Sequence, residues 1–467
     1  MSVVRQEAQG MVTGEVGSGE AGSGQRRHGR TRREQLALLA GGVAALGAAC
    51  GPGQSAPAEV KERGPVTLRD QRASTQGSAV ELSDAAIKAR YPWLTVVHEN
   101  TSSSSFDAMA KLVVDAAAGT LPDIIYAQGT QIQYYISQKI VIPMTPYLNR
   151  DKAFDVADFP KVALDMYSRA GQAYAIPYDH GPQMLFYNAE LFKRHGVAPP
   201  DEKWTFDTLV EAARKLTIPD QQWGLMDAGP RGSWSLLSYL APWGASWVDE
   251  TETRTQIDSA GAVTAMQYWM DLYFKHKVAP VPGTYQAGWG DQNNPWMLGK
   301  VGMVLGGPWT VREWRSRNVA LDAPIADYPL GPTGKRVSSS MGSGYPITTG
   351  SKLKDEAWLY TAEFLGKDLE RSMMGQFVQL GTGTPVRFSL MKEYERSRFA
   401  PPNARLIAPS EKYSVIGRPI SPAKVELDAI WAEEMKPLWA QTSSVKDMLG
   451  TVARRMAPVL EKNKAGF

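Results

Sequence analysis

Apolar residues recur along this chain in two alternating patterns, short β-rich runs and longer segments with helical spacing. The runs Leu94–His98 and Asp123–Tyr126 have the composition of buried strands. Between them, Phe106, Met109 and Leu112 lie on one face of a helix. Strands that alternate with helices in this way predict an α/β fold with a largely parallel sheet covered on both faces.

The same alternation continues through the rest of the chain. It predicts helices at 82–90, 204–216, 233–241, 259–275, 294–299, 355–366, 368–379, 423–434 and 445–462. It also predicts strands or extended segments at 66–69, 222–226, 301–305, 322–329 and 344–348.

The stretch Gln172–Phe192 interrupts this regular pattern. Gln172–Pro177 and Gln183–Tyr187 have strand composition, whereas Tyr178–Pro182 between them contains His, Gly and Pro and is typical of a turn. Asn188 is placed to begin a helix. Two strands that flank a rigid polar break predict a crossing of the chain between two lobes. An ordinary β-hairpin within one domain fits the same local pattern.

The N-terminal residues 1–49 have the composition of an export signal. A Gly/Ser-rich run leads to the basic cluster 26–33, and the following run, Leu36–Ala49, contains no charged residue. That apolar run is too short to span a bilayer. Thr31–Leu36 resembles the twin-arginine export motif. We therefore expect an exported protein, located in the periplasm or at the outer face of the cytoplasmic membrane.

Cys50 is the single cysteine of the chain, so no intramolecular disulfide can form. It follows Leu46–Ala49, which resembles the lipobox of bacterial lipoproteins, although Gly47 stands where that box prefers leucine. This resemblance implies lipidation of Cys50 and attachment to the membrane through a lipid anchor. The Gly/Pro-rich residues 50–64 are predicted to form a flexible tether.

The charge balance excludes one large class of partners. Residues 1–49 hold six of the 51 Lys and Arg and four of the 48 Asp and Glu, which leaves 45 against 44 in the mature chain. A near-neutral protein has no electrostatic footprint for nucleic acid. The length of 467 residues allows two or three domains, and no later apolar run is long enough to span a membrane. We expect a soluble monomer with at most a lipid anchor.

Motifs of catalysis and metal binding are scarce. The five His residues show no paired metal-ligand spacing, and G-x-S-x-G is absent. Ser389-x-x-Lys392 and Ser443-x-x-Lys446 fit the first motif of the serine β-lactamases, but no K-T-G accompanies them. The sequence thus predicts no catalytic residue, no metal site and no cofactor.

Tryptophan is concentrated in the middle of the chain, where ten of the 14 residues lie between Trp204 and Trp314. Several of these, including Trp243, Trp247, Trp289 and Trp309, stand in Gly/Pro/Ser-rich loops with polar neighbours. Sugars offer apolar C–H faces and hydroxyl groups, so they are bound by flat rings and planar polar side chains. Any single ring could instead be a packed core residue. As a set, these residues predict a carbohydrate site that includes Trp289, Asp291, Trp309, Tyr345 and Arg387.

Seven short motifs occur in an order that resembles one protein family. They are Leu121–Ile125, Tyr174–Pro177, Leu185–Phe192, Trp204–Phe206, Gly299–Met303, Gly307–Trp309 and Gly383–Arg387. Together they resemble the extracellular solute-binding proteins of bacterial ABC importers, the sugar-binding family that includes maltose-binding protein. The resemblance covers nearly the whole mature chain.

The resemblance implies an α/β, two-lobed periplasmic-binding-protein fold of type II, with a ligand cleft between the lobes and three crossings. The implied lobes are 65–178 with 330–382, and 183–326 with 386–467. The implied crossings are Tyr178–Pro182, Asp327–Pro329 and Gly381–Pro385. The ligand contacts carried over by motif are Gln128, Tyr178, Asp179, Trp243 and Trp309. After the first strand, Asp70-Gln71-Arg72 departs from the family's commoner Trp/Gly-rich turn.

The function implied is capture of a carbohydrate outside the membrane and its delivery to an ABC importer permease. The richness in tryptophan favours an oligosaccharide over a monosaccharide. A second hypothesis keeps the fold but assigns a polyol or a glycerol phosphodiester, with Arg231 and Arg387 on the phosphate. A third is a secreted glycoside hydrolase, for which Asp179 and Asp291 are the candidate carboxylate pair.

Overall fold

A computed structural model describes residues 64–73, 77–101, 106–226, 236–281, 294–307, 310–311, 323–380, 384–417 and 421–463. The chain divides into two compact units, Met1–Ser55 and Ala56–Phe467, and all described residues belong to the second. The predicted export signal, Cys50 and all but the last residue of the predicted tether lie outside the described residues.

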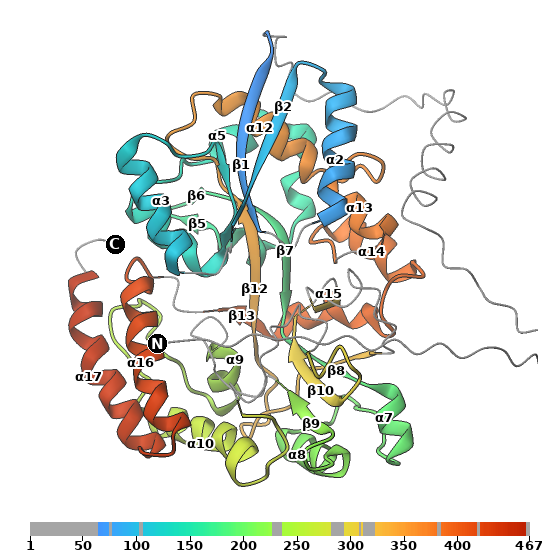
Figure 1. Ribbon diagram of the computed structural model, residues 1–467, viewed down its shortest axis with the longest axis vertical. Helices are drawn as coiled ribbons and strands as arrows, with labels where there is room; N and C mark the ends of the chain where they lie inside the picture. The colour runs from blue at the N-terminus through green and yellow to red at the C-terminus, as the bar shows by residue number, and fades with distance from the viewer. Residues whose placement is uncertain are drawn as a thin grey trace, which may run out of the picture. The chain divides into compact units, whose positions relative to one another are not determined.

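The first sheet is parallel and has the strand order β2-β1-β3. β1 (Val66–Ala73) pairs along its whole length with β2 (Leu94–Thr101), and its second half pairs with β3 (Ile124–Ile125). The helices α2 (Gly77–Arg90) and α3 (Phe106–Ala118) connect these strands (Figure 1). This arrangement confirms the parallel sheet predicted for the N-terminal part of the chain.

The second sheet is mixed and has the order β11-β8-β10-β9. β10 (Val301–Gly306) runs parallel to β9 (Trp223–Met226) and antiparallel to β8 (Met184–Tyr187). The short β11 (Ile325–Ala326) closes the other edge, antiparallel to β8. The prediction of a largely parallel sheet is therefore confirmed for the first sheet, whereas the second sheet is mixed.

Two long strands, β7 (Ile176–Pro182) and β12 (Ser338–Tyr345), run side by side between the two sheets (Figure 1). The prediction of a turn at Tyr178–Pro182 is wrong, because these residues form most of β7. Their strand conformation is stabilised by antiparallel pairing with β12, a segment about 160 positions later in the sequence. Pairing with β7 from Ser340, and with β13 (Ser414–Ile416) from Ser338, starts β12 ahead of the strand predicted at 344–348.

Smaller elements complete this central sheet. β13 (Ser414–Ile416) pairs in parallel with the first half of β12, and β4 (Ala127–Gln128) pairs antiparallel with its second half. A separate two-stranded hairpin joins β5 (Ser168–Arg169) to β6 (Gln172–Ala173).

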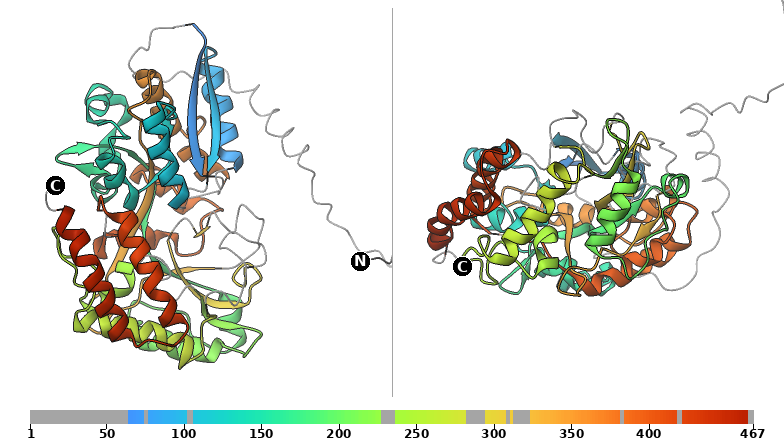
Figure 2. Two further views of the ribbon diagram at one scale, coloured as in Figure 1. Left: turned by 60° about the vertical axis from the view of Figure 1, so that its left-hand side comes forward. Right: turned by 90° about the horizontal axis from the view of Figure 1, so that it is seen from below.

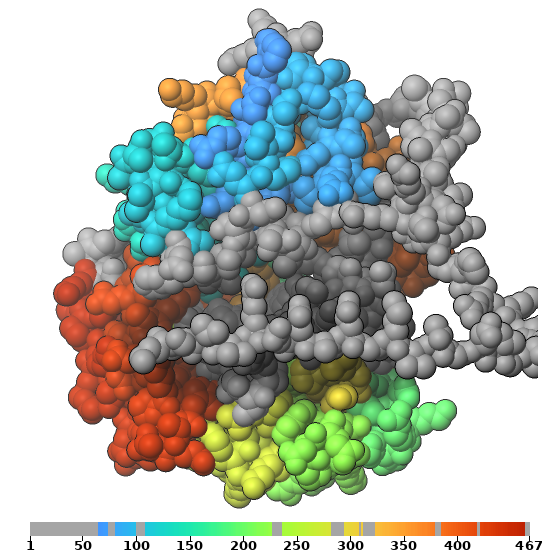
Figure 3. Space-filling view, in the orientation of Figure 1, coloured from blue at the N-terminus to red at the C-terminus, as the bar shows by residue number. Residues whose placement is uncertain are grey.

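Among the described residues, the other α-helices are α4 (Ile132–Ser137), α5 (Thr145–Arg150), α6 (Lys161–Asp165), α7 (Ala189–Arg194), α8 (Phe206–Leu216), α9 (Leu236–Leu240), α10 (Ala260–Phe274), α12 (Lys354–Phe364), α13 (Met373–Leu380), α14 (Phe388–Arg396), α15 (Ile407–Ser410), α16 (Lys424–Trp439) and α17 (Val445–Asn463). The predicted long C-terminal helices are confirmed as α16 and α17, which lie side by side in both views of Figure 2. In the space-filling view, residues of α2 and β2 (blue) and of α16 and α17 (red) lie on the same face (Figure 3).

The hydrophobic core is built from different helices around each sheet. Helices α8, α10, α16 and α17 pack around the second sheet, with Trp247, Trp269 and Trp431 buried among them. Trp247 is therefore a core residue, with no exposed surface for a ligand. Helices α2, α12, α13 and α14 pack with the first sheet, and their cluster extends to Phe186 of β8.

The packing of α14 bears on the predicted lobe boundary. Val386 and the apolar face of α14 share a core cluster with Phe154 and Phe377. Those two residues belong to the predicted lobe 1, whereas 386–467 was predicted to belong to lobe 2. Further along, Pro402 accepts a hydrogen bond at 3.0 Å from the backbone of Ile325 in β11. The boundaries stay a prediction, and these contacts favour a third crossing after α14.

Candidate functional site

Ser343 of β12 lies at the centre of the candidate site. In the strand register it is opposite Gln128 of β4 on one side and Asp179 of β7 on the other. Tyr178 is adjacent to Asp179 in β7, and Tyr345 lies two residues after Ser343 in β12. The pairing of three segments far apart in sequence thus gathers four of the predicted site residues.

Three tyrosine rings pack around this point. Tyr178 and Tyr345 have ring centroids 5.5 Å apart, and each lies 6.0 Å from Tyr126, all in edge-to-face arrangements. The hydroxyl of Tyr126 is hydrogen-bonded to Oγ of Ser343. Tyr178 and Tyr345 are 0% and 1% exposed, whereas Tyr126 keeps 8% of its surface. Like Trp247, Tyr178 and Tyr345 have no exposed surface for a ligand in this structure, and they pack as core rings against Tyr126, which is the most accessible of the three.

The polar groups of the site are fixed by hydrogen bonds from the same strands. Asp179 Oδ1 accepts a hydrogen bond of 2.7 Å from the backbone N–H of Ser343, and Asp179 is 8% exposed. The backbone N–H of Gln128 donates to the side chain of Gln131 at 2.9 Å, which fixes the turn after β4. Burial, and then the nearby Asp179 carboxylate, raise the pKa of Tyr167 well above its ordinary value. The carboxylate of Asp179 and the backbone of Gln128 are therefore held in place, whereas Tyr167 is enclosed in the interior.

A charged network adjoins the tyrosine cluster and was not predicted as part of the site. Nε of Arg72 donates to Asp70 Oδ2, and its Nη2 donates to the hydroxyl of Tyr360, which in turn donates to Asp84 Oδ1 at 2.6 Å. His98 Nε2 lies 2.5 Å from Asp84 Oδ2, and its Nδ1 lies 3.3 Å from Asp70 Oδ2. Burial acts to lower the pKa of His98, but its hydrogen bonds to Asp70 and Asp84 raise it above the ordinary value.

The sequence did carry a signal for this network. Arg69, Asp70, Gln71 and Arg72 place four polar residues in succession in a strand of a parallel sheet, where apolar runs are usual. Arg72 is 2% exposed and its guanidinium lies 5.5 Å from the centroid of the Tyr345 ring. The polar end of β1 is therefore in contact with a predicted ligand residue.

The first half of β12 carries three fully buried serines, Ser338, Ser339 and Ser340. Oγ of Ser340 lies 3.2 Å from Nε2 of His180, and the same Nε2 lies 3.2 Å from Oε1 of Glu411. In a catalytic triad, the carboxylate contacts the ring nitrogen that does not face the serine. Here Ser340 and Glu411 contact the same ring nitrogen of His180, Nε2. These contacts therefore connect β7, β12 and the segment before β13, and they do not activate Ser340 as a nucleophile.

Two predicted residues lie away from the tyrosine cluster. Trp243 packs against Phe206 and Tyr268 at centroid distances of 4.8 and 4.9 Å, and it is only half-buried.

Arg387 is 0% exposed, and its guanidinium donates to the backbone carbonyls of Leu365, Asp155 and Phe154 at 3.1, 3.0 and 2.9 Å. Arg387 therefore has a structural role, which does not support its prediction as a ligand contact. Trp289, Asp291, Trp309 and Arg231 lie outside the described residues.

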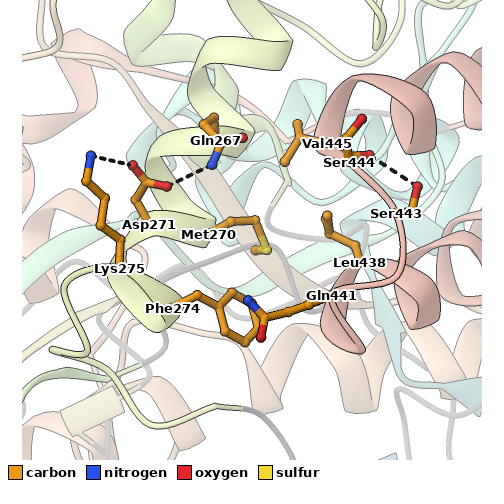
Figure 4. A pocket seen from close by; sticks show the side chains of 10 residues that line it. All are labelled: Gln267, Met270, Asp271, Phe274, Lys275, Leu438, Gln441, Ser443, Ser444 and Val445. Carbon is orange, nitrogen blue, oxygen red and sulfur yellow. Dashed lines mark hydrogen bonds and ion pairs between the residues drawn. The ribbon is translucent and has the colours of Figure 1, made fainter.

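A surface pocket of about 400 Å³ lies between α10 and the α16–α17 turn (Figure 4). Met270, Phe274 and Leu438 form part of its lining, and Asp271 is hydrogen-bonded to Gln267 at 2.7 Å. None of the predicted site residues lines this pocket, so we do not assign the ligand to it.

In the described ranges, no group of three or more His, Cys, Asp or Glu could hold a metal ion. No helix in the same ranges is long and apolar enough to cross a membrane.

The sequence and structure match known binding proteins. Residues 72–368 match the family model for bacterial extracellular solute-binding proteins. The chain is 23% identical over 404 residues to a putative binding protein of Brucella abortus (strain 2308). The match covers 85% of this chain and 93% of that protein. It is 26% identical over 294 residues to the lactose-binding protein of Rhizobium radiobacter, with 59% and 67% of the two chains covered.

The fold is also found in solved structures. One is an ABC substrate-binding protein from Listeria monocytogenes in complex with cycloalternan, with a TM-score of 0.74 and 19% identity over 86% of this chain and 100% of that one. This likeness confirms the predicted two-lobed periplasmic-binding-protein fold. Because the family model spans more than half of the sequence, the chain belongs to the family of bacterial extracellular solute-binding proteins, as its motifs indicated.

Proposed function

We propose that this protein is the carbohydrate-binding component of an ABC importer, and that it captures an oligosaccharide and delivers it to the membrane permease. Membership of the family makes it a solute-binding protein that acts outside the cytoplasm. The observation that carries the choice of ligand is the group around Ser343, where the hydroxyl of Tyr126 and the carboxylate of Asp179 are both hydrogen-bonded to Ser343, opposite Gln128. The similar lactose-binding protein, and the similar fold of a protein solved in complex with cycloalternan, support the same class of ligand.

The proposed mechanism is closure of two lobes over the ligand. A ligand that contacts both lobes binds the closed state more tightly than the open one and so shifts the population towards it. β7 and β12 run between the two sheets and also carry Asp179 and Ser343. Movement of these strands would therefore couple ligand contact directly to closure, and the permease would recognise the closed form.

We further propose that the protein is a monomer exported through a twin-arginine-like signal and held at the membrane by lipid on Cys50. The order of basic cluster, apolar run and lone cysteine in residues 26–50 supports the export route and the lipid anchor. Mass spectrometry of membrane-extracted protein would detect an acylated N-terminal cysteine. A mature N-terminus at any other residue would contradict the anchor.

A thermal-shift screen tests the ligand class. A sugar at 100 times its dissociation constant should stabilise the native state by about 2.7 kcal/mol, which is visible as a rise of a few degrees in Tm. We expect such a rise with an oligosaccharide and a smaller one with its monosaccharide. A rise with ribitol or glycerophosphoglycerol alone would instead favour the polyol or phosphodiester hypothesis.

We expect Trp309→Ala and Trp289→Ala each to weaken oligosaccharide binding by about 2 kcal/mol, because stacked aromatic anchors dominate binding energy. Isothermal titration calorimetry would measure this as a roughly 30-fold rise in Kd. Trp439→Ala, a change in α16 outside the predicted site, is the control and should leave Kd unchanged. If both loop variants bind as tightly as wild type, the assignment of these tryptophans is wrong.

The glycoside hydrolase hypothesis requires a second carboxylate beside Asp179 to complete an acid–base pair. Its other member, Asp291, lies outside the described residues. Turnover of a chromogenic glycoside by the purified protein, abolished by Asp179→Asn, would establish an enzyme and contradict the transport proposal. We expect binding without turnover.

A further inference from the structure

His98 of β2 connects two carboxylates that come from different elements. Asp70 is opposite His98 in the register of β1 and β2, so the two side chains leave the same face of the sheet. Nδ1 of His98 lies 3.3 Å from Asp70 Oδ2, and Nε2 lies 2.5 Å from Oδ2 of Asp84 in α2. The neighbouring Glu99 leaves the other face of β2, where it pairs with Arg69. The ring of His98 therefore joins α2, which lies beside β1 and β2 in Figures 1 and 2, to the first sheet.

Nδ1 of His98 has two kinds of neighbour. Besides the acceptor on Asp70 it meets a donor, because Nε of Arg72 lies 2.9 Å from it. A neutral ring with its proton on Nε2 donates to Asp84 and accepts from Arg72. A protonated ring donates from both nitrogens, to Asp84 and to Asp70. Uptake of one proton thus exchanges a contact with Arg72 for a second contact with a carboxylate.

The groups that surround the ring come from three elements. Among the described residues, the titratable and charged groups that face it are Asp70 and Arg72 of β1, Asp84 of α2 and Tyr360 of α12. Tyr360 donates to Asp84 at 2.6 Å and accepts from Arg72. Lys88 of α2 instead donates to the backbone carbonyl of Leu94 at 2.8 Å.

The charge balance of this cluster depends on His98. Asp70 and Asp84 carry two negative charges, whereas Arg72 carries one positive charge. A protonated His98 balances the cluster, and a neutral one leaves one negative charge uncompensated, which is costly because Asp70 is 0% exposed. The side chains of His98 and Asp84 keep 22% and 26% of their surface, so protons reach the ring from the solvent.

We propose that His98 is a proton-sensitive joint, which holds α2 firmly on the first sheet when it is protonated and weakens that attachment when it loses its proton. Burial acts to lower the pKa of His98, but its hydrogen bonds to Asp70 and Asp84 raise it above the ordinary value of about 6.5. The stabilisation is therefore complete below about pH 6.5 and is lost as the pH rises through the pKa of the folded state. Members of this family act outside the cytoplasm, where the pH follows the surroundings. The inference does not depend on which solute is bound.

The direct test is titration of the His98 ring by NMR, in protein labelled at the Cε1 atoms of histidine. The resonance is assigned through the backbone, so the measurement needs no His98 variant. We expect a midpoint above about 6.5 for wild type and a lower midpoint for Asp84→Asn, which keeps the shape of the side chain and removes its charge. A wild-type midpoint at or below about 6.5, or one that Asp84→Asn leaves in place, would overturn the proposal.

The second test compares the pH dependence of stability in His98→Gln and in wild type. Urea unfolding at a series of pH values gives the ratio of their unfolding constants, in which the other titrating groups largely cancel. This ratio should be greatest near about pH 6 and fall by up to about tenfold for each pH unit as His98 loses its proton, since one proton then distinguishes the folded from the unfolded state. A ratio that stays constant with pH would show that the contacts of His98 are structural only.

His276→Gln is the matched control. Burial, and then the guanidinium of Arg214 at 2.6 Å from Nδ1, lower the pKa of His276. Above about pH 7.5 this histidine is therefore neutral in both the folded and the unfolded state, and His276→Gln should unfold with the same pH dependence as wild type. If the ratio for His276→Gln falls with pH as the ratio for His98→Gln does, the effect does not belong to His98 and the proposal fails.

Discussion

Replacing Arg387 with Met is expected to lower the free energy of unfolding by about 3–5 kcal/mol, the range for breaking a buried charged interaction by removing one partner. The guanidinium contacts the rings of Phe154 and Phe159 at 4.6 and 4.2 Å and donates to three carbonyls. Methionine fills much of the volume, but it leaves those carbonyls without their donor and removes the ion pair of Arg387 with Asp158 at 3.6 Å. Urea denaturation followed by tryptophan fluorescence measures the loss.

The control for this change is Arg396→Met, an exposed arginine of α14 that is 3.6 Å from Glu393. A surface substitution of this kind should change stability by no more than about 0.5 kcal/mol. The folded fraction of Arg387→Met should bind carbohydrate with the affinity of wild type. A variant of normal stability and reduced affinity would restore Arg387 to the ligand site and contradict its structural role.

Arg387 also shows what a sequence can and cannot indicate. The residue stands after a Gly/Pro-rich break and beside polar residues, a context that suits a ligand contact as well as a buried anchor. Burial lowers the pKa of Arg387 to about 10, although Asp158 and Asp155 oppose this, so the side chain remains charged at neutral pH. Which role it has depends on Phe154 and Leu365, and their proximity comes from tertiary packing that no local pattern encodes.

The local elements were more predictable, because caps and apolar spacing are set by neighbouring residues. The helices predicted to start at 204 and 259 begin within two residues of those positions, with Thr205 and Ser259 as the N-caps of α8 and α10, and Asn188 Oδ1 accepts from Leu191 N to begin α7 as predicted. β7 was misjudged because its strand conformation depends on β12. Gln128, Tyr178, Asp179 and Tyr345 were chosen from motifs and residue type, and their meeting around Ser343 follows from that same non-local pairing.

Close approach of β7 and β12 requires glycine at position 342. Gly342 is opposite His180 in the strand register, and a Cβ added there would overlap the carbonyl oxygen of Asp179 and lie 3.2 Å from Cα of His180. Both obstacles are backbone atoms, so no side-chain rotation can relieve them. Any larger residue must separate the two strands or bend one of them.

We therefore expect Gly342→Val to lower the free energy of unfolding by about 3 kcal/mol, at the upper end of the range for overpacking. The variant should also weaken carbohydrate binding, since separation of β7 from β12 breaks the hydrogen bond from Ser343 N to Asp179 Oδ1. Gly450→Ala in α17 is the opposite control: its added Cβ would lie 3.7 Å from Arg454, and it should stabilise the helix by up to about 1 kcal/mol. Chemical denaturation and calorimetry on the same samples measure both effects. Unchanged stability and affinity in Gly342→Val would show that the two strands separate freely, and would remove the structural basis for coupling ligand contact to lobe closure.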